Sequence, residues 1–461
     1  MTTTRPPYQW ELAFPTTGPG EAGGRRGQEV EMATAAPGPE SPAVTTNFME
    51  RICAPDNIER ALRAVVRNKG AAGIDGVTVG ALPEVLAAHW SEIEEQLLRG
   101  RYRPQPVRRV RIPKPAGGWR DLGIPTALDR LLQQAVLQQL QPLWDPTFSE
   151  HSYGFRPGRS AHQAVVQAQA YVNEGYRWCV DIDLEKFFDR VNHDKLMAEV
   201  SKRIADRRVL RLIRAFLTAG VLDAGLFQDS REGTPQGGPL SPVLSNLVLD
   251  ELDRELERRG HRFVRYADDC NIYVRSEKAG RRVMVSITRF IERRLKLQVN
   301  AAKSAVAHPW DRTFLGFTVR NEPEHRRCIA GKAIARFKDR VRELTRRHRG
   351  VSVERMIADL NPVLRGWAGY FGFGQLPSQL QSLDGWIRRR LRCVAWVQWK
   401  TRRRRYEELR RLGVGEKAAS PAVFSPKGPW RLSSSGALHR AFTKARFKKM
   451  GLLSLEQMAA A

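Results

Sequence analysis

Hydrophobic residues recur along this chain at two spacings, one typical of strands and one typical of helices. The predicted strands are residues 107–112, 178–182, 262–266, 271–275 and 314–319. The predicted helices are residues 125–143, 160–174, 193–200, 240–259 and 282–295. Strands separated by helices, with a tight acidic turn between two of them, favour an α+β fold.

The pattern becomes entirely helical beyond about residue 330. Apolar residues then follow three helical stripes that begin at Ile334, Met356 and Leu383, and the other faces carry arginine. We therefore predict a three-helix unit followed by a short, basic appendix. The first 47 residues are rich in Gly, Pro, Thr and Ala and show no apolar period, so we predict a disordered leader with Met32 and Met49 as possible later starts.

Composition restricts the partner more than the fold. The 461 residues include 77 Lys and Arg against 49 Asp and Glu, giving a net charge of +28 and a pI near 10.6. Such an excess indicates a polyanion, most often nucleic acid, whereas a merely solubilising surface usually mixes both signs. The five cysteines form no Cys-x-x-Cys pair, which argues against a zinc ribbon and favours a reduced cytoplasmic setting. No apolar run is long enough to span a membrane.

Two groups of carboxylates are the candidate chemistry. Asp268 and Asp269 are adjacent in a turn between two predicted strands. An ordinary acidic turn would explain that pair alone, but a hairpin built for stability favours Asn-Gly or Asp-Gly. Asp181 and Asp183 alternate with apolar residues, so both point to one face of another strand. Carboxylates from two strands on one sheet face can hold two Mg²⁺ ions for in-line phosphoryl transfer.

These motifs resemble those of the reverse transcriptases encoded by bacterial group II introns. Tyr266-Ala-Asp-Asp269 matches the family's Tyr-x-Asp-Asp signature, and Asp-x-x-x-Phe-Phe-Asp matches its first acidic motif. Aligning Phe-Phe-Asp places the metal ligand at Asp183, with Asp181 as the fallback. Five further blocks occur in the family's order, starting at Ile112, His151, Gly233, Leu297 and Phe314.

The resemblance implies a right-hand polymerase with a defined division of the chain. Residues 48–320 form fingers and palm, an antiparallel sheet with helices, and residues 321–412 form a helical thumb or maturase domain. Residues 413–461 form a small basic DNA-binding segment after the leader of residues 1–47. It also implies three catalytic, metal-binding carboxylates on two Mg²⁺ ions: Asp183, Asp268 and Asp269.

The resemblance further implies a deoxynucleotide pocket of five residues: Lys114, Arg120, Phe188, Gln236 and Lys303. Lys114 and Arg120 flank a Gly-Gly turn, so both side chains can reach a triphosphate. A solvated hairpin tip would have the same sequence pattern. Phe188 follows Asp183 by five residues, where family members exclude a 2′-hydroxyl; taken alone, it would be a core residue. Lys303 is a candidate general acid for pyrophosphate.

The C-terminal motifs resemble a maturase domain, and the chain resembles the class C type, which lacks an endonuclease domain. Arginines interleaved with Trp396, Trp399 and Tyr406 suit RNA backbone contact and base stacking, the alternative being a solvated basic face. The predicted RNA-binding residues are Arg388, Arg389, Arg390, Arg402, Arg403, Arg404 and Arg405.

The resulting hypothesis is an RNA-directed DNA polymerase of a mobile intron that also assists splicing. Its implied partners are group II intron RNA, an RNA template with a DNA primer, target DNA and deoxynucleotides, with no membrane, in the bacterial cytoplasm or nucleoid. One alternative is a maturase with an inactive polymerase, which the intact carboxylates argue against. Another is a domesticated relative that acts in DNA repair or phage defence.

Overall fold

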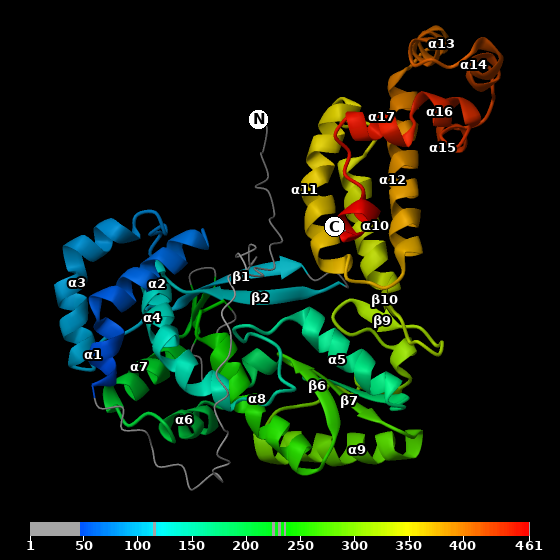
Figure 1. The fold of residues 1–461 in the computed structure, drawn as a ribbon. Coiled ribbons are helices and arrows are strands. Elements are labelled where there is room, and N and C mark those ends of the chain that lie inside the picture. Colours follow the sequence, from blue (N-terminus) through cyan, green and yellow to red (C-terminus); the bar gives the residue numbers. More distant parts are fainter. Residues whose placement is uncertain (1–46, 114–116, 224–225, 229–231, 235–236, 461) are drawn as a thin grey trace, which may run out of the picture. The chain divides into compact units, whose positions relative to one another are not determined.

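The computed structural model describes residues 47–113, 117–223, 226–228, 232–234 and 237–460 (Figure 1). Residues 1–46 of the predicted leader and two residues of the predicted nucleotide pocket, Lys114 and Gln236, lie outside these ranges. The described chain begins with three helices: α1 (Phe48–Cys53), α2 (Pro55–Arg67) and α3 (Leu82–Leu98).

The first of two four-stranded sheets, called the hairpin sheet, has the strand order β2-β1-β4-β5. Its strands are β1 (Val107–Pro113), β2 (Trp119–Ile124), β4 (Val221–Asp223) and β5 (Leu226–Gln228). The prediction of β1 is confirmed, and it pairs antiparallel with β2 so that Ile112 lies opposite Arg120. β4 and β5 were missed because they have only three residues each, and β2 was missed because buried and exposed residues do not alternate along it.

The second four-stranded sheet, called the acidic sheet, has the order β6-β7-β3-β8, with each neighbouring pair antiparallel. Its strands are β3 (Trp178–Asp183), β6 (Arg262–Tyr266), β7 (Asp269–Val274) and β8 (Ala305–Ala307). One face carries Val180, Ile182 and Ile272, which belong to the main hydrophobic core. The register places Cys179, Asp181, Asp183, Asn271 and Asp269 on the opposite face.

Six helices pack around these sheets: α4 (Ala127–Trp144), α5 (Ala161–Asn173), α6 (His193–Ser201), α7 (Arg207–Thr218), α8 (Ser241–Arg258) and α9 (Glu277–Phe290). Apolar residues of α8 and α9 join the core beneath the apolar face of the acidic sheet. α5 covers part of the other face, where Val165 packs with Cys179 and Tyr273. The acidic residues at the ends of β3 and β7 lie beyond that cover.

Two predicted elements begin more than two residues away from their positions in the structure. The predicted strand at residues 314–319 is only β9 (Phe317–Val319), paired with β10 (Arg327–Ile329). Leu315 has φ 51° and Gly316 has φ 82°, so a tight turn folds Phe314 back to bridge Phe317. α9 begins earlier than predicted because Ser276 caps it, and it continues into a π-helical turn at Ile291–Leu295.

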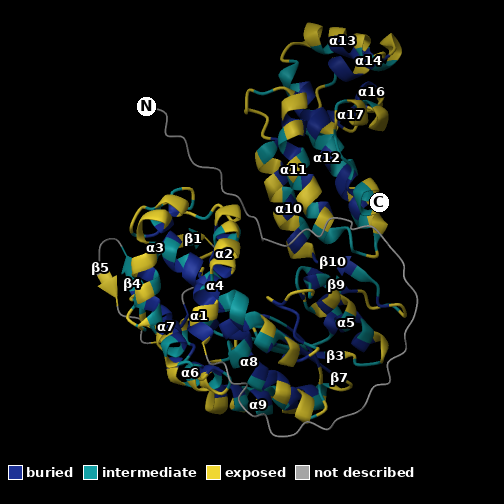
Figure 2. Ribbon diagram, turned by 60° about the vertical axis from the view of Figure 1, so that its left-hand side comes forward, coloured by how far each residue is buried: buried dark blue, intermediate teal, exposed yellow. Residues whose placement is uncertain are grey.

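The predicted three-helix unit is confirmed as α10 (Gly331–Leu344), α11 (Val353–Phe371) and α12 (Pro377–Gln398). Buried and exposed residues alternate along these helices (Figure 2). Short helices follow: α13 (Arg402–Arg411), α14 (Glu416–Val423), α15 (Pro429–Leu432), α16 (Gly436–Ala441), α17 (Lys444–Lys449) and α18 (Leu455–Ala460). One hydrophobic cluster runs from Ile329 to Leu455, so these helices share the core of the three-helix unit. None of the described helices is both long and apolar enough to cross a membrane.

Candidate active site

The acidic residues of two strands meet at one edge of the acidic sheet. β3 and β7 are neighbours, and Asp183 lies directly opposite Asp269. Asp268 occupies the turn that joins β6 to β7, as the sequence predicted. Ala267 adopts φ 57° in that turn, a left-handed conformation that lets the chain reverse within two residues. The three predicted carboxylates are therefore brought together.

Asp183 is held by contacts from the segment before β8. The main-chain oxygen of Asp183 accepts from the Asn300 amide at 2.8 Å, and its amide donates to Ser304 Oγ at 3.0 Å. Lys303 Nζ lies 3.2 Å from Asp183 Oδ2, and its side chain is 69% exposed. The predicted pocket lysine is thus next to the predicted metal ligand, with its ammonium group accessible to a substrate.

Asp181, the fallback ligand, has a different partner. Its carboxylate forms an ion pair with Arg312, and Arg312 Nη2 also donates to the Lys303 carbonyl at 2.8 Å. The Asp181 side chain is only 15% exposed, against 31% for Asp183. This arrangement favours Asp183 as the metal ligand and makes Asp181 an anchor for the loop that carries Lys303.

Burial and neighbouring carboxylates raise the proton affinity of Asp268 and Asp269. Burial, reinforced by the charges of Asp181, Asp268 and Asp183, raises the pKa of Asp269 to about 8. Burial also raises the pKa of Asp268; the neighbouring Asp183 adds to the effect, while Arg120 and Arg265 oppose it. Such a cluster of carboxylates is stabilised by a proton or a cation.

The donor set suits a hard divalent cation that also binds a substrate. Among the described residues, no three His, Cys, Asp or Glu side chains are grouped closely enough to enclose a metal ion. Mg²⁺ commonly takes only one or two carboxylates from a protein and completes its octahedron with water and substrate phosphates. Asp183 and Asp268 match that pattern, and the raised pKa of Asp269 marks an excess of negative charge there.

The remaining described pocket residues lie near this edge. Arg120 is close enough for its charge to lower the pKa of Asp268. Phe188 is partly buried against the core, and its ring meets that of Phe187 edge-on with a centroid distance of 5.2 Å. The Phe188 carbonyl accepts from the Thr234 amide at 2.6 Å, which fixes the Gly-rich segment beside it.

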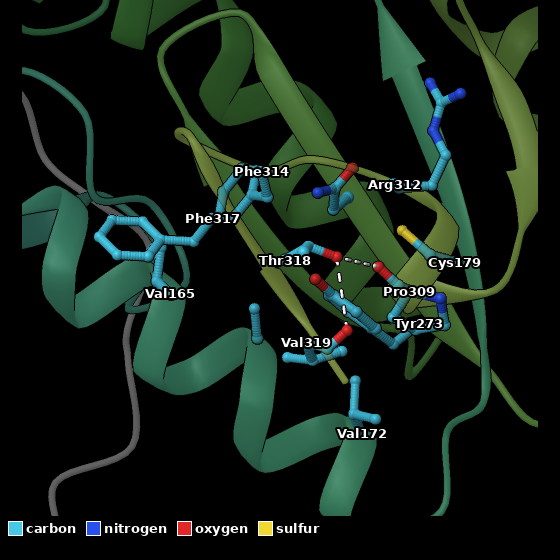
Figure 3. A pocket seen from close by; sticks show the side chains of 12 residues that line it. Val165, Val172, Cys179, Tyr273, Pro309, Arg312, Phe314, Phe317, Thr318 and Val319 are labelled. Atoms are coloured by element: carbon cyan, nitrogen blue, oxygen red, sulfur yellow. Dashed lines mark hydrogen bonds between the residues drawn. The ribbon is translucent and has the colours of Figure 1, made fainter. Parts of the chain in front are cut away.

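A small cavity of about 30 Å³ lies on the acidic face of the sheet, between α5, that face and the turn before β9 (Figure 3). Cys179, Tyr273 and Arg312 line it, together with apolar side chains from α5. Asn271 also lines it, and its Oδ1 has no hydrogen-bond partner among the described residues. A cavity of this size can accept a water molecule but not a nucleotide.

Three of the predicted RNA-binding arginines are exposed, and others are occupied inside the C-terminal helices. Arg402, Arg403 and Arg404 lie exposed on α13. The Arg405 guanidinium instead lies 4.8 Å from the Trp396 ring centre, and Trp396 is only 1% exposed. The expectation that Trp396 stacks on RNA bases is therefore wrong, because α12 buries that ring in the hydrophobic core.

Two arginines of α12 likewise hold the helices together. Arg389 lies 4.1 Å from the Trp430 ring centre and donates to the Trp430 carbonyl at 3.1 Å. Arg390 donates to Thr345 Oγ1 at 2.7 Å. Arg388 has no hydrogen bond or ion pair among the described residues and is half-buried. A sequence cannot separate these packing arginines from free ones because their partners are distant in the chain.

Sequence reasoning missed two charged residues at the site, Arg312 and Arg265. Arg265 directly precedes Tyr266 and is fully buried, and it is bonded to Asp253 on α8. The alternation of residues along β6 could have identified Arg265, because it places this charged residue on the otherwise apolar face of the strand.

Comparison with known proteins agrees with the geometry. Residues 112–319 match the family described as reverse transcriptase (RNA-dependent DNA polymerase), and residues 334–413 match the maturase-specific domain of group II introns. Protein YkfC of Escherichia coli is 35% identical over 57% of this chain and 79% of its own length. The group II intron-encoded protein LtrA of Lactococcus lactis is 30% identical over 60% of this chain and 57% of its own length. Among solved structures, a partial Cas6-RT-Cas1–Cas2 complex aligns with 54% of this chain and 43% of that one, at 24% identity and a TM-score of 0.36.

Proposed function

The chain belongs to the family of group II intron-encoded reverse transcriptases that carry a maturase domain. On that premise we propose which residues carry out each of the family's activities. The family's activities are RNA-directed DNA synthesis and assistance of intron splicing. We assign residues 48–320 to fingers and palm, 321–412 to the thumb and maturase domain, and 413–461 to DNA binding, following the leader of residues 1–47.

The observation that carries the catalytic proposal is the pairing of β3 with β7, which sets Asp183 opposite Asp269 beside the Asp268 turn. Asp183, Asp268 and Asp269 are the proposed catalytic residues, and they hold Mg²⁺. When bound, two such ions supply activation of a primer 3′-hydroxyl and charge stabilisation on the leaving pyrophosphate. Asp183 and Asp268 would orient the ions, and Asp269, opposite Asp183 on β7, would add negative charge to hold them.

The cationic residues around this edge act on the triphosphate. Arg120 already influences the charge of Asp268, so its guanidinium can neutralise phosphate oxygens at the same place. Lys303 Nζ, paired with Asp183, is positioned to pass a proton to the departing pyrophosphate. Lys114 and Gln236, which lie outside the described residues, complete the proposed pocket on the strength of their sequence motifs alone.

Phe188 is the proposed gate for deoxynucleotides. It follows β3 directly, in the short helical turn Phe187–Asp189, and its carbonyl binds the segment that leads to Gln236. A ring held rigidly by the core on one side leaves no room for a 2′-hydroxyl on the other.

The maturase domain binds intron RNA in this proposal, and the polymerase copies it during retrohoming into target DNA. The surface arginines Arg402, Arg403 and Arg404 on α13 supply phosphate contacts. The domesticated alternative remains a second candidate, and a catalytic intron RNA flanking the gene would decide against it.

DNA synthesis on a poly(rA) template with an oligo(dT) primer tests the catalytic proposal. Wild-type protein should extend the primer with Mg²⁺ present and stop when the ion is chelated. Asp268→Asn should be inactive while it still binds intron RNA, because RNA binding needs no metal carboxylate. Extension by the Asp268→Asn protein would refute the assignment of the metal site.

A further inference from the structure

We propose that Arg265 is a positioning residue for the catalytic turn, which it fixes from the opposite face of the sheet before any metal binds. This inference rests on the proposed polymerase function and deepens it. Arg265 lies at the end of β6, one residue before the turn, and its side chain points away from the carboxylates. Its role is therefore indirect and must act through the backbone of the turn.

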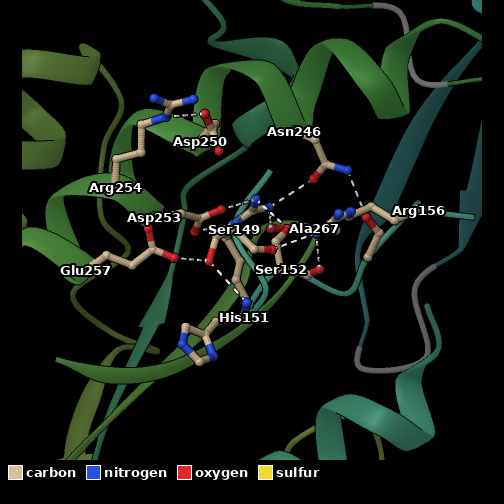
Figure 4. A network of polar contacts seen from close by, with 12 residues as sticks. Ser149, His151, Ser152, Arg156, Asn246, Asp250, Asp253, Arg254, Glu257 and Ala267 are labelled. Carbon is tan, nitrogen blue, oxygen red and sulfur yellow. Dashed lines mark hydrogen bonds and ion pairs between the residues drawn. The ribbon is translucent and has the colours of Figure 1, made fainter. Parts of the chain in front are cut away.

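Every N–H group of the Arg265 guanidinium has a partner. Nε donates to Asp253 Oδ1 at 2.7 Å, and Nη2 donates to Asp253 Oδ2 at 2.5 Å and to Ser152 Oγ at 2.7 Å. Nη1 donates to Asn246 Oδ1 and to the Ala267 carbonyl, both at 3.0 Å. These bonds use all five donors of a guanidinium. Figure 4 shows four of these partner residues, Ser152, Asn246, Asp253 and Ala267, gathered in one polar network.

The bond to the Ala267 carbonyl connects the network to the catalytic turn. Ala267 is the left-handed residue whose φ of 57° reverses the chain. A left-handed alanine is less stable than a right-handed one, so an external constraint helps the turn to keep this conformation. The guanidinium supplies it at the peptide oxygen between Ala267 and Asp268.

A second segment is attached to the turn by the same network. The Arg265 amide donates to the His151 carbonyl and the Tyr153 amide donates to the Arg265 carbonyl, both at 2.9 Å. Asn246 Nδ2 donates to the Gly154 carbonyl at 2.8 Å. A Cβ on Gly154 would lie 2.2 Å from the Ala267 nitrogen, so this loop packs directly on the turn. Three distant motifs therefore form one rigid support.

Stability alone does not account for this pair. The side chains of Arg265 and Asp253 are 1% and 0% exposed. Removing two charges from water costs several kcal/mol, and hydrophobic replacements for such pairs are often as stable. A fully bonded arginine that reaches the one strained residue of the catalytic turn is better explained by the geometry it imposes there.

The test uses the full chain and two variants that preserve charge balance. Arg265→Lys keeps a cation for Asp253 but cannot also reach the Ala267 carbonyl. The double variant Arg265→Gln, Asp253→Asn removes both charges, so neither is left buried alone. Ser152→Ala is the matched control, because it removes one bond from the same guanidinium without touching the turn.

The readouts are Mn²⁺ binding by electron paramagnetic resonance without nucleotide, and kcat and KM for primer extension per folded molecule. Both Arg265 variants should lose roughly tenfold or more in Mn²⁺ affinity and kcat, as supporting residues of metal ligands commonly do. KM for the deoxynucleotide should change much less, and Ser152→Ala should stay within about twofold on every measure. Wild-type Mn²⁺ affinity and kcat in a folded Arg265 variant would overturn the inference.

One measurement on the wild type does not depend on any variant folding. If Arg265 fixes the turn in advance, the amides of Asp269 and Cys270 should exchange as slowly without metal as those in the middle of β7. Fast exchange there that becomes slow only with Mg²⁺ would also overturn the inference. A wild type that binds Mn²⁺ tightly but synthesises no DNA would instead count against the proposed function and leave the positioning role standing.

Discussion

Arg312 forms an ion pair with Asp181 and, through the same Nη2, donates to the main-chain carbonyl of Lys303. Lys303 in turn places its ammonium group 3.2 Å from Asp183. The two aspartates of β3 therefore play different parts although they share one face. Asp183 faces the site, whereas Asp181 holds the loop that brings Lys303 to it.

This difference predicts unequal effects of the same substitution. Asp183→Asn should reduce RNA-templated DNA synthesis by roughly a thousandfold, because losing a metal ligand removes about 4 kcal/mol of transition-state stabilisation. Asp181→Asn should cost roughly tenfold or less, since it loosens only the Lys303 loop. Single-turnover primer extension at saturating Mg²⁺ measures both. The reverse order of severity would make Asp181 the ligand.

Phe188 should control sugar selection. Phe188→Val should raise incorporation of ribonucleotides relative to deoxynucleotides by roughly tenfold or more, because the space beside the 2′-carbon opens. Phe187→Val is the matched control: its ring is 2% exposed and packs in the core, so it should lower stability without changing discrimination. Competition assays at one template position measure the ratio of ribonucleotide to deoxynucleotide incorporation. Equal ratios for the two variants would mean that Phe188 is only a core residue and does not select the sugar.

The stability of the metal-free protein should depend on Asp269. Its pKa is raised to about 8 in the folded protein, above the unfolded value of about 3.9, so it contributes stability that is full below about pH 4 and lost as the pH rises through about 8. In chelator, the melting temperature should therefore fall from pH 5.5 to 8.5 more steeply for wild type than for Asp269→Asn. Adding Mg²⁺ at pH 8.5 should raise the melting temperature of the wild type more than that of the Asp269→Asn variant. If the melting temperatures of the two proteins fell in parallel with pH, Asp269 would not be the cause of the pH dependence.

The sequence predicted the acidic edge because two separate patterns, a strand with alternating aspartates and an acidic turn, both place carboxylates there. The alternation around Asp181 and Asp183, together with the Asp268 turn, requires only that the two strands pair. The strand period could mark Arg265 as a charge on an apolar face, but it could not reveal the partners of Arg265, which lie on a helix and a loop distant in sequence. Sequence reasoning also misjudged Trp396, because an aromatic residue among arginines looks the same whether the ring is buried or free. Long-range contacts decide such cases.

The last prediction concerns which arginines bind RNA. Arg403 and Arg404 are paired with Glu407 and Glu408 one helical turn away. The Arg403–Glu407 pair is exposed and worth only about 0.2–0.5 kcal/mol, so a phosphate can readily replace the glutamate. Glu408 is buried, but it keeps Arg411 as a partner when Arg404 turns to a phosphate. Arg405, packed on Trp396, cannot be freed as easily. Changing Arg402, Arg403 and Arg404 to Gln should therefore weaken intron RNA binding and flatten the slope of log affinity against log salt by up to about 2 to 3 units.

Two comparisons separate a binding surface from a general effect of charge. Changing Arg281, Arg282 and Arg289 on α9 to Gln removes the same three charges from exposed positions and should leave the slope within about 1 unit of wild type. Arg389→Gln should instead lower the melting temperature, because it loses the Trp430 contacts, with little change in the slope. Splicing assistance should follow RNA affinity across this series and should survive Asp268→Asn. If the α9 variant flattened the slope as much as the α13 variant, the three arginines of α13 would be an ordinary solvated face, and RNA would have to be held elsewhere in the chain.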